Sequence, residues 1–315
     1  MSEPRTAVVA LGGNAITLDG VPDTIANQFR HTRQSLEGVV ALARSGFRLA
    51  ITHGNGPQVG NAILRVEISR GQAPELPLGI CVADTEGGMG YMIEQSLYNA
   101  LHVAGVHRDV VTVITQVVVD EHDPAVSDPS KFIGRFYPKG KALELAAENG
   151  WTVKPQGKGG WRRVVPSPLP KAIVESDMIS DLVARGAIVI CCGGGGIPVF
   201  KLEDGRLEGL DAVVDKDRAS AVLAAQIRAD ILLILTAVDQ VCLGYGSERA
   251  VPLSSLTAAE AERYLAEGHF PPGSMGPKIE AALDFLRQGG REVVITSIPM
   301  AVDAVAGRAG TRIRP

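Results

Sequence analysis

Short apolar runs alternate along the chain with longer segments in which apolar residues recur every three or four positions. The runs at 6–11, 47–52 and 229–236 are rich in β-branched residues and too short for helices, which predicts strands. The helical spacing predicts a long helix near 25–43 and another over 86–104. Because alternating strands and helices build layered α/β folds, we expect an open, mostly parallel sheet sandwiched by helices.

The same pattern predicts further strands and helices after residue 105. Predicted strands are 109–119, 187–192 and, as the last strand, 292–297, and another strand is expected to end within 213–220. Predicted helices are 141–148, 173–184, 218–227 and 258–267. Asp217 is expected to cap the helix 218–227. Proline favours the first position of a helix, so Pro277 is expected there, with Lys278 at the second position.

The pattern changes between about 120 and 165, where the chain is rich in proline, glycine and charge. This segment is predicted to be a protruding insertion with one short helix and no core of its own. Long insertions of this kind are often lids or binding flaps. A passive surface loop is the alternative that the local pattern leaves open.

Composition narrows the class of partner. The 315 residues carry a net charge of −4, which argues against nucleic acid or an anionic membrane. No stretch reaches the ~18 apolar residues of a membrane span, and no leader is evident, so a cytoplasmic protein is expected. The four cysteines lack metal-binding spacing and are expected to be buried, reduced thiols; they are Cys81, Cys191, Cys192 and Cys242.

Three predicted strands end in glycine-rich loops, at 12–14, 53–57 and 193–196. Carboxyl ends of parallel strands meet at one edge, so these loops are expected to line one crevice. A helix beginning near Gly56 would point its amides into that crevice. The spacing does not fit a dinucleotide fingerprint or a P-loop. For 193–196 a flexible turn is the alternative to a cradle for an anion.

Lys216 and Lys278 are both expected near helix N-termini, where the macrodipole disfavours a cation unless an anion lies between them. No Ser-His-Asp, Cys-His or paired-carboxylate arrangement is evident, and only His53 lies at a candidate site. Phosphoryl transfer fits this absence because it depends on positioning and charge stabilisation. An acceptor oxygen that is already anionic needs no general base.

The chain resembles the carbamate kinases of the amino-acid-kinase fold. The resemblance rests on ALGGNAI, THGNGPQVGN, TQVVVD, DPSKFIGRFY, GWRRVVPSP, ICCGGGGIPV, VVDKDRAS, LTAVDQV and GHFPPGSMGPKIEAA, in order from about residue 7 to 297. It implies reversible, Mg²⁺-dependent phosphoryl transfer between carbamoyl phosphate and ADP, giving ATP and carbamate. It also implies a homodimer and a place in arginine metabolism, although arginine, agmatine, purine or cyanate breakdown could each supply the substrate.

The resemblance also implies roles for particular parts of the chain. Residues 1–205 would hold the carbamoyl group and residues 206–315 the nucleotide. Lys131 of the insertion would reach the transferring phosphoryl group, and Lys216 would neutralise its charge. Lys278 would bind the nucleotide phosphates, and Asp217 would hold the lysine side chains in position.

The remaining expected contacts fall into two sets. Substrate binding is assigned to Gly12, Gly13, Asn14, Gly54, Asn55, Gly56, Gly194 and Gly195. Nucleotide binding is assigned to Lys216, Thr236, Asp239, Tyr245, Gly246, Met275, Gly276 and Lys278. No metal ligand from the protein is expected, because Mg²⁺ would arrive with the nucleotide.

Two comparisons with the family concern the insertion. Many relatives in the superfamily carry a lysine just before the first Gly-Gly, where this chain has Ala10 and Leu11, and carbamate kinases supply a lysine from the insertion instead. The family usually has prolines where this chain has Phe132 and Arg135. The alternatives to a carbamate kinase are a kinase of another small carboxylic or amino acid, and a non-catalytic nucleotide-binding regulator.

Overall fold

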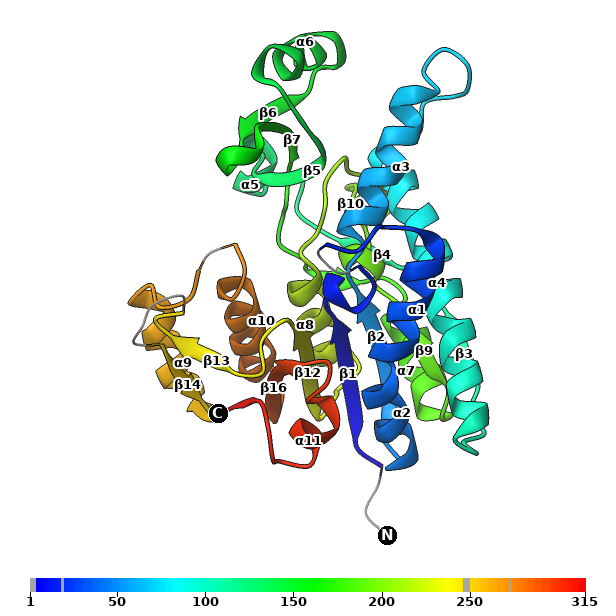
Figure 1. Cartoon of the computed structure of the whole chain (residues 1–315), viewed down its shortest axis with the longest axis vertical. Coiled ribbons are helices and arrows are strands. Elements are labelled where there is room, and N and C mark those ends of the chain that lie inside the picture. Colours follow the sequence, from blue (N-terminus) through cyan, green and yellow to red (C-terminus); the bar gives the residue numbers. More distant parts are fainter. Residues whose placement is uncertain (1–3, 18–19, 246–249, 272) are drawn as a thin grey trace.

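An eight-stranded sheet runs through the middle of the computed structural model, which describes residues 4–17, 20–245, 250–271 and 273–315 (Figure 1). Its strands lie in the order β15 (Ser255–Thr257), β17 (Thr311–Arg314), β16 (Glu292–Ser297), β12 (Ile231–Thr236), β1 (Thr6–Leu11), β2 (Arg48–His53), β9 (Ile188–Ile190) and β3 (Val110–Thr112). Every neighbouring pair is parallel except β16 and β17. The predicted open, mostly parallel sheet is confirmed.

Helices cover both faces of this sheet because successive side chains of each strand point to opposite sides. Val8 and Ala10 of β1 face one core, which is covered by α7 (Ser176–Ala184), α8 (Lys216–Gln226), α9 (Ala258–Ala266) and α10 (Gly276–Arg287). Val9 and Leu11 face the other core, which is covered by α1 (Ile25–Ser35), α2 (Glu37–Arg44), α4 (Leu78–Val103) and α11 (Ala301–Val305). The β-branched runs therefore form a strand layer buried on both sides.

Several predicted boundaries are wrong. The helix expected near 25–43 is interrupted at Leu36, and the helix expected from 86 begins at Leu78. Residues 213–215 lie outside any strand and lead directly into α8. The strand at 292–297 is not the last one, because β17 follows and adds to the sheet edge.

The strand predicted over 109–119 is two strands in different sheets. β3 ends at Thr112, and β4 (Gln116–Val118) joins a second sheet in the order β11 (Leu207–Gly209), β10 (Ile197–Lys201), β4 and β8 (Ala172–Ile173). The chain changes sheets at Thr115, which is fully buried and whose backbone N–H donates to Glu86 at 2.8 Å. This side-chain partner replaces the ladder bond that a continuous strand would have formed.

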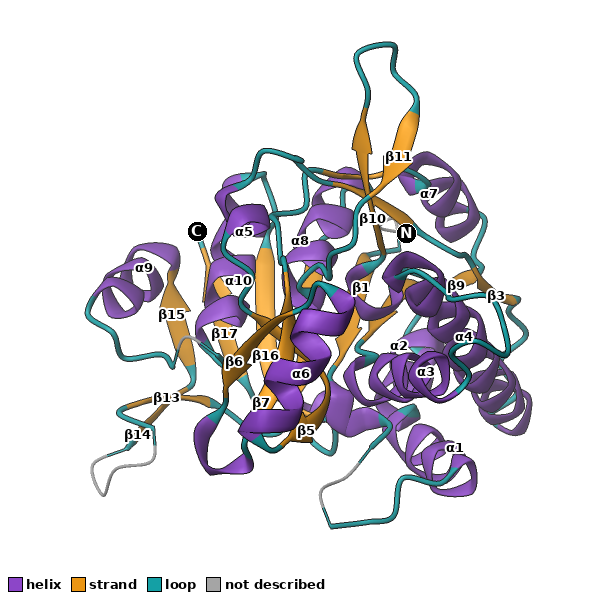
Figure 2. Ribbon diagram, turned by 90° about the horizontal axis from the view of Figure 1, so that it is seen from above, coloured by secondary structure: helices purple, strands orange, loops and turns teal. Residues whose placement is uncertain are grey.

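The insertion stands beyond the carboxyl edge of the central sheet, beside α3 (Gly56–Ile68) (Figures 1 and 2). Its elements are α5 (Pro124–Ser127), β5 (Lys131–Tyr137), α6 (Lys139–Asn149), β6 (Thr152–Pro155) and β7 (Trp161–Val165). The predicted helix near 141–148 is confirmed by α6. The insertion strands form an antiparallel sheet, and its Ile133 and Val165 pack against Val59 and Ile63 of α3, so these apolar side chains join a core shared with the body of the protein.

The remaining pieces are a hairpin of β13 (Val241–Leu243) and β14 (Val251–Leu253), and three short 3₁₀ helices, η1 (Gly13–Ala15), η2 (Gly157–Gly159) and η3 (Gly193–Gly195). Two of these 3₁₀ helices, η1 and η3, sit directly beyond central strands. Among the described residues, none of the helices combines the length and apolar character that crossing a bilayer requires.

Candidate active site

The glycine-rich loops meet at one edge of the sheet and line a cavity of about 700 Å³. Gly13 follows β1, Gly54 to Gly56 follow β2, and Gly194 lies in η3 after β9. α3 begins at Gly56, so its first amides point toward the same space. The structure thus brings together three segments that lie 40 residues or more apart in the sequence.

Two lysines from different helices converge on one carboxylate in this cavity. Lys278 Nζ lies 3.1 Å from Asp217 Oδ2, and Lys216 Nζ is paired with Asp217 Oδ1. Both lysine side chains are mostly buried, at 17% and 13% exposed, and Asp217 is nearly inaccessible. Lys216 is the first residue of α8 and Lys278 lies in the first turn of α10, so both cations sit at positive helix ends. An anion binding between them would be strongly favoured.

Asp217 stays ionised in this setting. Burial acts to raise the pKa of its carboxyl, but the charges of Lys216 and Lys278 and their hydrogen bonds outweigh it and hold the pKa at about 2. The carboxylate therefore keeps both ammonium groups in place without neutralising them fully, since two cations share one anion.

Asp215, rather than Asp217, caps α8. Its Oδ1 accepts the backbone N–H of Asp217 at 3.0 Å and that of Arg218 at 3.4 Å. Its other oxygen, Oδ2, accepts Lys131 Nζ of the insertion at 3.0 Å. The prediction that Asp217 caps the helix is wrong by one half-turn, because the helix begins at Lys216. Pro277 and Lys278 are likewise one position further into α10 than predicted.

The wall formed by η3 is packed too closely for any side chain at Gly194. A Cβ there would lie 2.1–2.3 Å from the amide of Asn55, and the backbone φ of +66° is one that favours glycine. Asn55 itself is buried and donates through Nδ2 to Thr85 Oγ1 at 2.9 Å. The glycine run is thus a fixed part of the cavity wall, which argues against the flexible-turn alternative.

A second, smaller cavity of about 160 Å³ lies beyond β12. Four residues assigned to nucleotide binding line it: Thr236, Tyr245, Met275 and Lys278. Lys278 and Ser274 line both cavities, so the two spaces share a wall. Cys242 also lines the small cavity and is half-buried, whereas the sequence predicted a buried thiol.

The other assigned residues that the structure describes are not among those that line either cavity. Gly12 passes over β12, donating to Leu235 O at 3.0 Å, and a Cβ on Gly195 would lie 2.3 Å from Val214 O. Asp239 accepts from Ser297 Oγ, and Gly276 donates to Pro271 O at 2.9 Å. Asn14 lies in η1. Gly246 lies outside the described residues.

The sequence interpretation missed Arg162, which organises the loop that carries Lys131. Its Nη2 donates to Gly134 O at 2.8 Å, and its guanidinium lies over the rings of Phe132 and Phe136. Phe132 stands where the family usually has proline, so an arginine in contact with two aromatic rings holds a loop that prolines would otherwise stiffen. The sequence signal was the GWRR motif at 160–163 together with Phe132 and Phe136 earlier in the insertion.

His53 is buried at the end of β2. Burial lowers the pKa of its imidazole to about 4, with the charge of Lys216 acting in the same direction. The ring is therefore neutral at physiological pH and its Nδ1 lies 3.2 Å from Gly54 O. A neutral, enclosed ring fits a structural role for this histidine.

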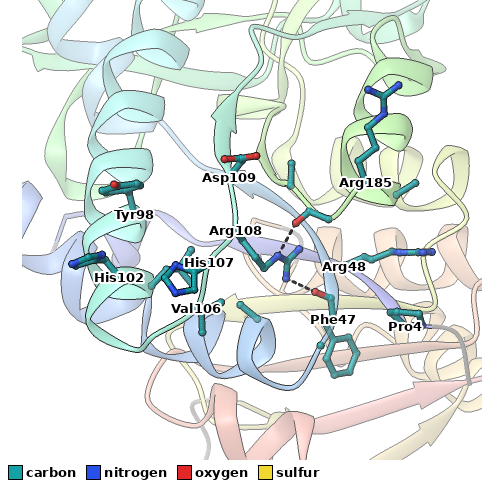
Figure 3. A pocket seen from close by; sticks show the side chains of 16 residues that line it. Pro4, Phe47, Arg48, Tyr98, His102, Val106, His107, Arg108, Asp109 and Arg185 are labelled. Atoms are coloured by element: carbon teal, nitrogen blue, oxygen red, sulfur yellow. Dashed lines mark hydrogen bonds between the residues drawn. The ribbon is translucent and has the colours of Figure 1, made fainter. Parts of the chain in front are cut away.

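A cavity of about 670 Å³ lies at the opposite, amino-terminal end of the sheet (Figure 3). Arg108 is central to it and donates to Gly186 O at 2.7 Å and Phe47 O at 2.6 Å. None of the residues assigned to substrate or nucleotide lines this cavity. Arg108 ties together the starts of β2, β9 and β3, so its role there is structural.

Comparisons with known proteins agree with this geometry. The model of the amino acid kinase family matches residues 5–297. Carbamate kinase of Pyrococcus horikoshii is 43% identical over 99% of this chain and 100% of its own length, and that of Thermococcus kodakarensis is 45% identical over 98% and 99%. The solved carbamate kinase of Giardia lamblia bound to AMP-PNP is 38% identical, with a TM-score of 0.94 and coverage of 100% and 99%.

The chain belongs to the amino acid kinase family. Within that family, these full-length relatives are carbamate kinases, and carbamate kinase function is what the likeness supports.

Proposed function

We propose that the protein transfers a phosphoryl group reversibly between carbamoyl phosphate and ADP, forming ATP and carbamate. The observation that carries the proposal is the arrangement of Lys131, Lys216 and Lys278 around one cavity walled by glycine loops. The likeness to carbamate kinases over nearly the whole chain supports this choice of substrate. Residues 1–205 would supply the carbamoyl side and residues 206–315 the nucleotide side.

The proposal gives each lysine a task. Lys216 and Lys278, held by Asp217, would stabilise the charge on the transferring phosphoryl group, and Lys278 would also contact the nucleotide phosphates. Lys131 would exchange its contact with Asp215 for the phosphoryl oxygens. No general base is needed because carbamate is already an anion, which agrees with the neutral state of His53.

Magnesium fits the proposed site as an ion carried by the nucleotide. The carboxylates of Asp215 and Asp217 face the cavity but are both paired with lysines, and the described residues include no cluster of three or more ligating side chains. When bound, the ion would neutralise phosphate charge and orient the nucleotide. The protein's own part is to hold the lysines around it.

The experiment that tests the function is a coupled assay of ATP formation from ADP, Mg²⁺ and carbamoyl phosphate. Acetyl phosphate and N-acetylglutamyl phosphate serve as matched alternative donors. Fast turnover with carbamoyl phosphate alone supports the proposal. Faster turnover with another acyl phosphate would assign a kinase of a different acid, and ADP binding without turnover would assign a regulator.

Replacing Lys278 by alanine is expected to weaken ADP binding by about tenfold or more, because a charge-assisted contact to phosphate is lost. Lys278 lines both cavities, so turnover should fall as well. Titration calorimetry with ADP measures the effect. Lys201→Ala, an exposed lysine on β10, is the control, and equal ADP affinity in the two variants would remove Lys278 from the nucleotide site.

A homodimer remains part of the proposal. Exposed apolar side chains on α1 and α4, among them Ile25 and Tyr91, border an apolar cavity of about 530 Å³ that a second copy could cover. Light scattering on the purified protein should give twice the chain mass of 33.1 kDa. The cytoplasm and arginine metabolism are the proposed setting.

A further inference from the structure

A glutamate is buried directly behind the glycine wall of the cavity. Glu86, on α4, is 2% exposed, and its Oε2 accepts the backbone N–H of Thr115 at 2.8 Å. Its Oε1 is enclosed and has no hydrogen-bond partner. A Cβ on Gly193 would lie 2.9 Å from Glu86 Cγ and 2.7 Å from the ring of His53, so the carboxyl and the imidazole flank the same backbone.

Two sets of hydrogen bonds connect Glu86 and its neighbour Thr85 to the cavity wall. Thr115, its partner, accepts the backbone N–H of Cys192 at its Oγ1 at 3.0 Å, and Cys192 immediately precedes η3. Thr85, the neighbour of Glu86 on α4, accepts the amide of Asn55. One turn of α4 therefore supports both Asn55 and the glycine wall from behind.

We propose that Glu86 is a positioning residue, kept as a neutral carboxylic acid, that fixes the glycine wall against which the carbamoyl group binds. The inference rests on the proposed function for its link to the substrate. It differs from the roles assigned to the lysines because Glu86 acts through Thr115 and η3 and does not line the cavity.

The surroundings of Glu86 favour its neutral form. Burial raises the pKa of this carboxyl to about 8, and the negative charge of Glu175 acts in the same direction, while the backbone N–H groups of Thr115 and Gly193 act against it. The facing His53 is neutral, and a hydrogen bond with Cys191, together with burial, raises the pKa of the Cys192 thiol. Among the described residues, none of the groups that act on Glu86 is a cation, so only backbone N–H groups offset a negative charge there.

Ionisation of Glu86 would have two consequences. It would place a buried charge where no described cation compensates it, which would loosen the packing around η3. It would also put a negative potential behind a wall that receives an anionic substrate. Both effects predict that the rate falls as the pH rises through about 8.

The first test is the pH profile of turnover at saturating ADP. Glu86→Gln keeps the shape and the acceptor for Thr115 but cannot ionise, so it is expected to retain the rate and to lose the alkaline fall. Wild type should fall about tenfold for each pH unit above the pKa of Glu86. Glu86→Leu, which keeps no hydrogen bond to Thr115, is expected to raise KM for carbamoyl phosphate at every pH.

Two neighbouring substitutions act as matched controls. Glu175→Gln removes the like charge and should move the alkaline fall to lower pH. Glu94→Gln lies on the same helix, bonded to Thr112 Oγ1 at 2.7 Å, and should leave the profile as in wild type. An alkaline fall that is the same in wild type and Glu86→Gln would overturn the proposal.

A second test does not depend on activity, so it separates this inference from the proposed function. For a carboxyl with a raised pKa, the folded state holds a proton that the unfolded state releases between pH 4.5 and about 8. Across that window the unfolding equilibrium constant of wild type should rise relative to Glu86→Gln, by up to about tenfold per pH unit. Infrared difference spectra should show a protonated carboxyl band that Glu86→Gln lacks. Parallel stability curves, with no such band, would refute a neutral Glu86 whatever the enzyme's substrate.

Discussion

Lys131→Ala is expected to lower turnover by about 10³-fold or more while ADP affinity stays near that of wild type. The expectation follows from its place: the ammonium group borders the large cavity from the insertion side and does not line the small cavity assigned to the nucleotide. A cation that contacts only the transferring group contributes in the transition state more than in the ground state. Single-turnover kinetics with carbamoyl phosphate, beside ADP titrations, measures both quantities.

Lys154→Ala provides the matched control for Lys131→Ala. Lys154 lies on β6 of the same insertion, is similarly exposed and pairs with Asp128 on the surface. The Lys154 pair is exposed and contributes about 0–1 kcal/mol, and the Lys131 side chain is itself 41% exposed, so neither variant should unfold. If both variants turned over equally fast, the insertion would supply no catalytic lysine.

Gly194→Ala is expected to lower kcat/KM for carbamoyl phosphate by about 100-fold or more. The added methyl group would displace the Asn55 amide, and a displacement of about 1 Å at a reacting site costs roughly that factor. The left-handed backbone adds about 1–2 kcal/mol of strain. ADP affinity should change little, because the glycine does not line the small cavity.

Gly205→Ala separates strain from contact. Gly205 has a φ of +86° and nothing within 4 Å of its would-be Cβ, so it bears the same kind of backbone cost with no neighbour to displace. A loss of stability at Gly205 that reflects backbone strain alone, a larger loss at Gly194, and loss of kcat/KM only at Gly194 are the expected pattern. Equal kinetics in both would mean that the glycine wall does not shape the substrate site.

The layered fold could be predicted because each strand and helix is specified by the apolar pattern of its own segment. The run at 231–236 is buried along nearly its whole length, and only a parallel sheet covered on both faces accommodates such a strand. β1 and β16 match their predicted bounds for the same reason. Boundaries failed where a distant side chain decides them. Thr115 breaks a β-branched run only because Glu86, 29 residues earlier, accepts its N–H.

Some residues of the candidate site could also be predicted from the sequence, and others could not. Glycines and lysines at strand ends could be recognised from spacing and from resemblance, and the structure gathers most of them at two adjoining cavities. The sequence could not show that Asp215 both caps α8 and pairs with Lys131, because Lys131 lies 84 residues away in the insertion. Glu86 gave no signal either, since a glutamate on an amphipathic helix is ordinarily exposed and only the packing of three segments buries it.

The insertion leaves and re-enters the molecule at adjacent points. β4, which precedes it, and β8, which follows it, are antiparallel neighbours, and Lys171 N donates to Val118 O at 2.8 Å. Its length and sequence therefore place no demand on the register of the central sheet. Mutations in the insertion, including the loop that carries Lys131, can therefore change that loop without shifting the strands from which the glycine-rich loops extend.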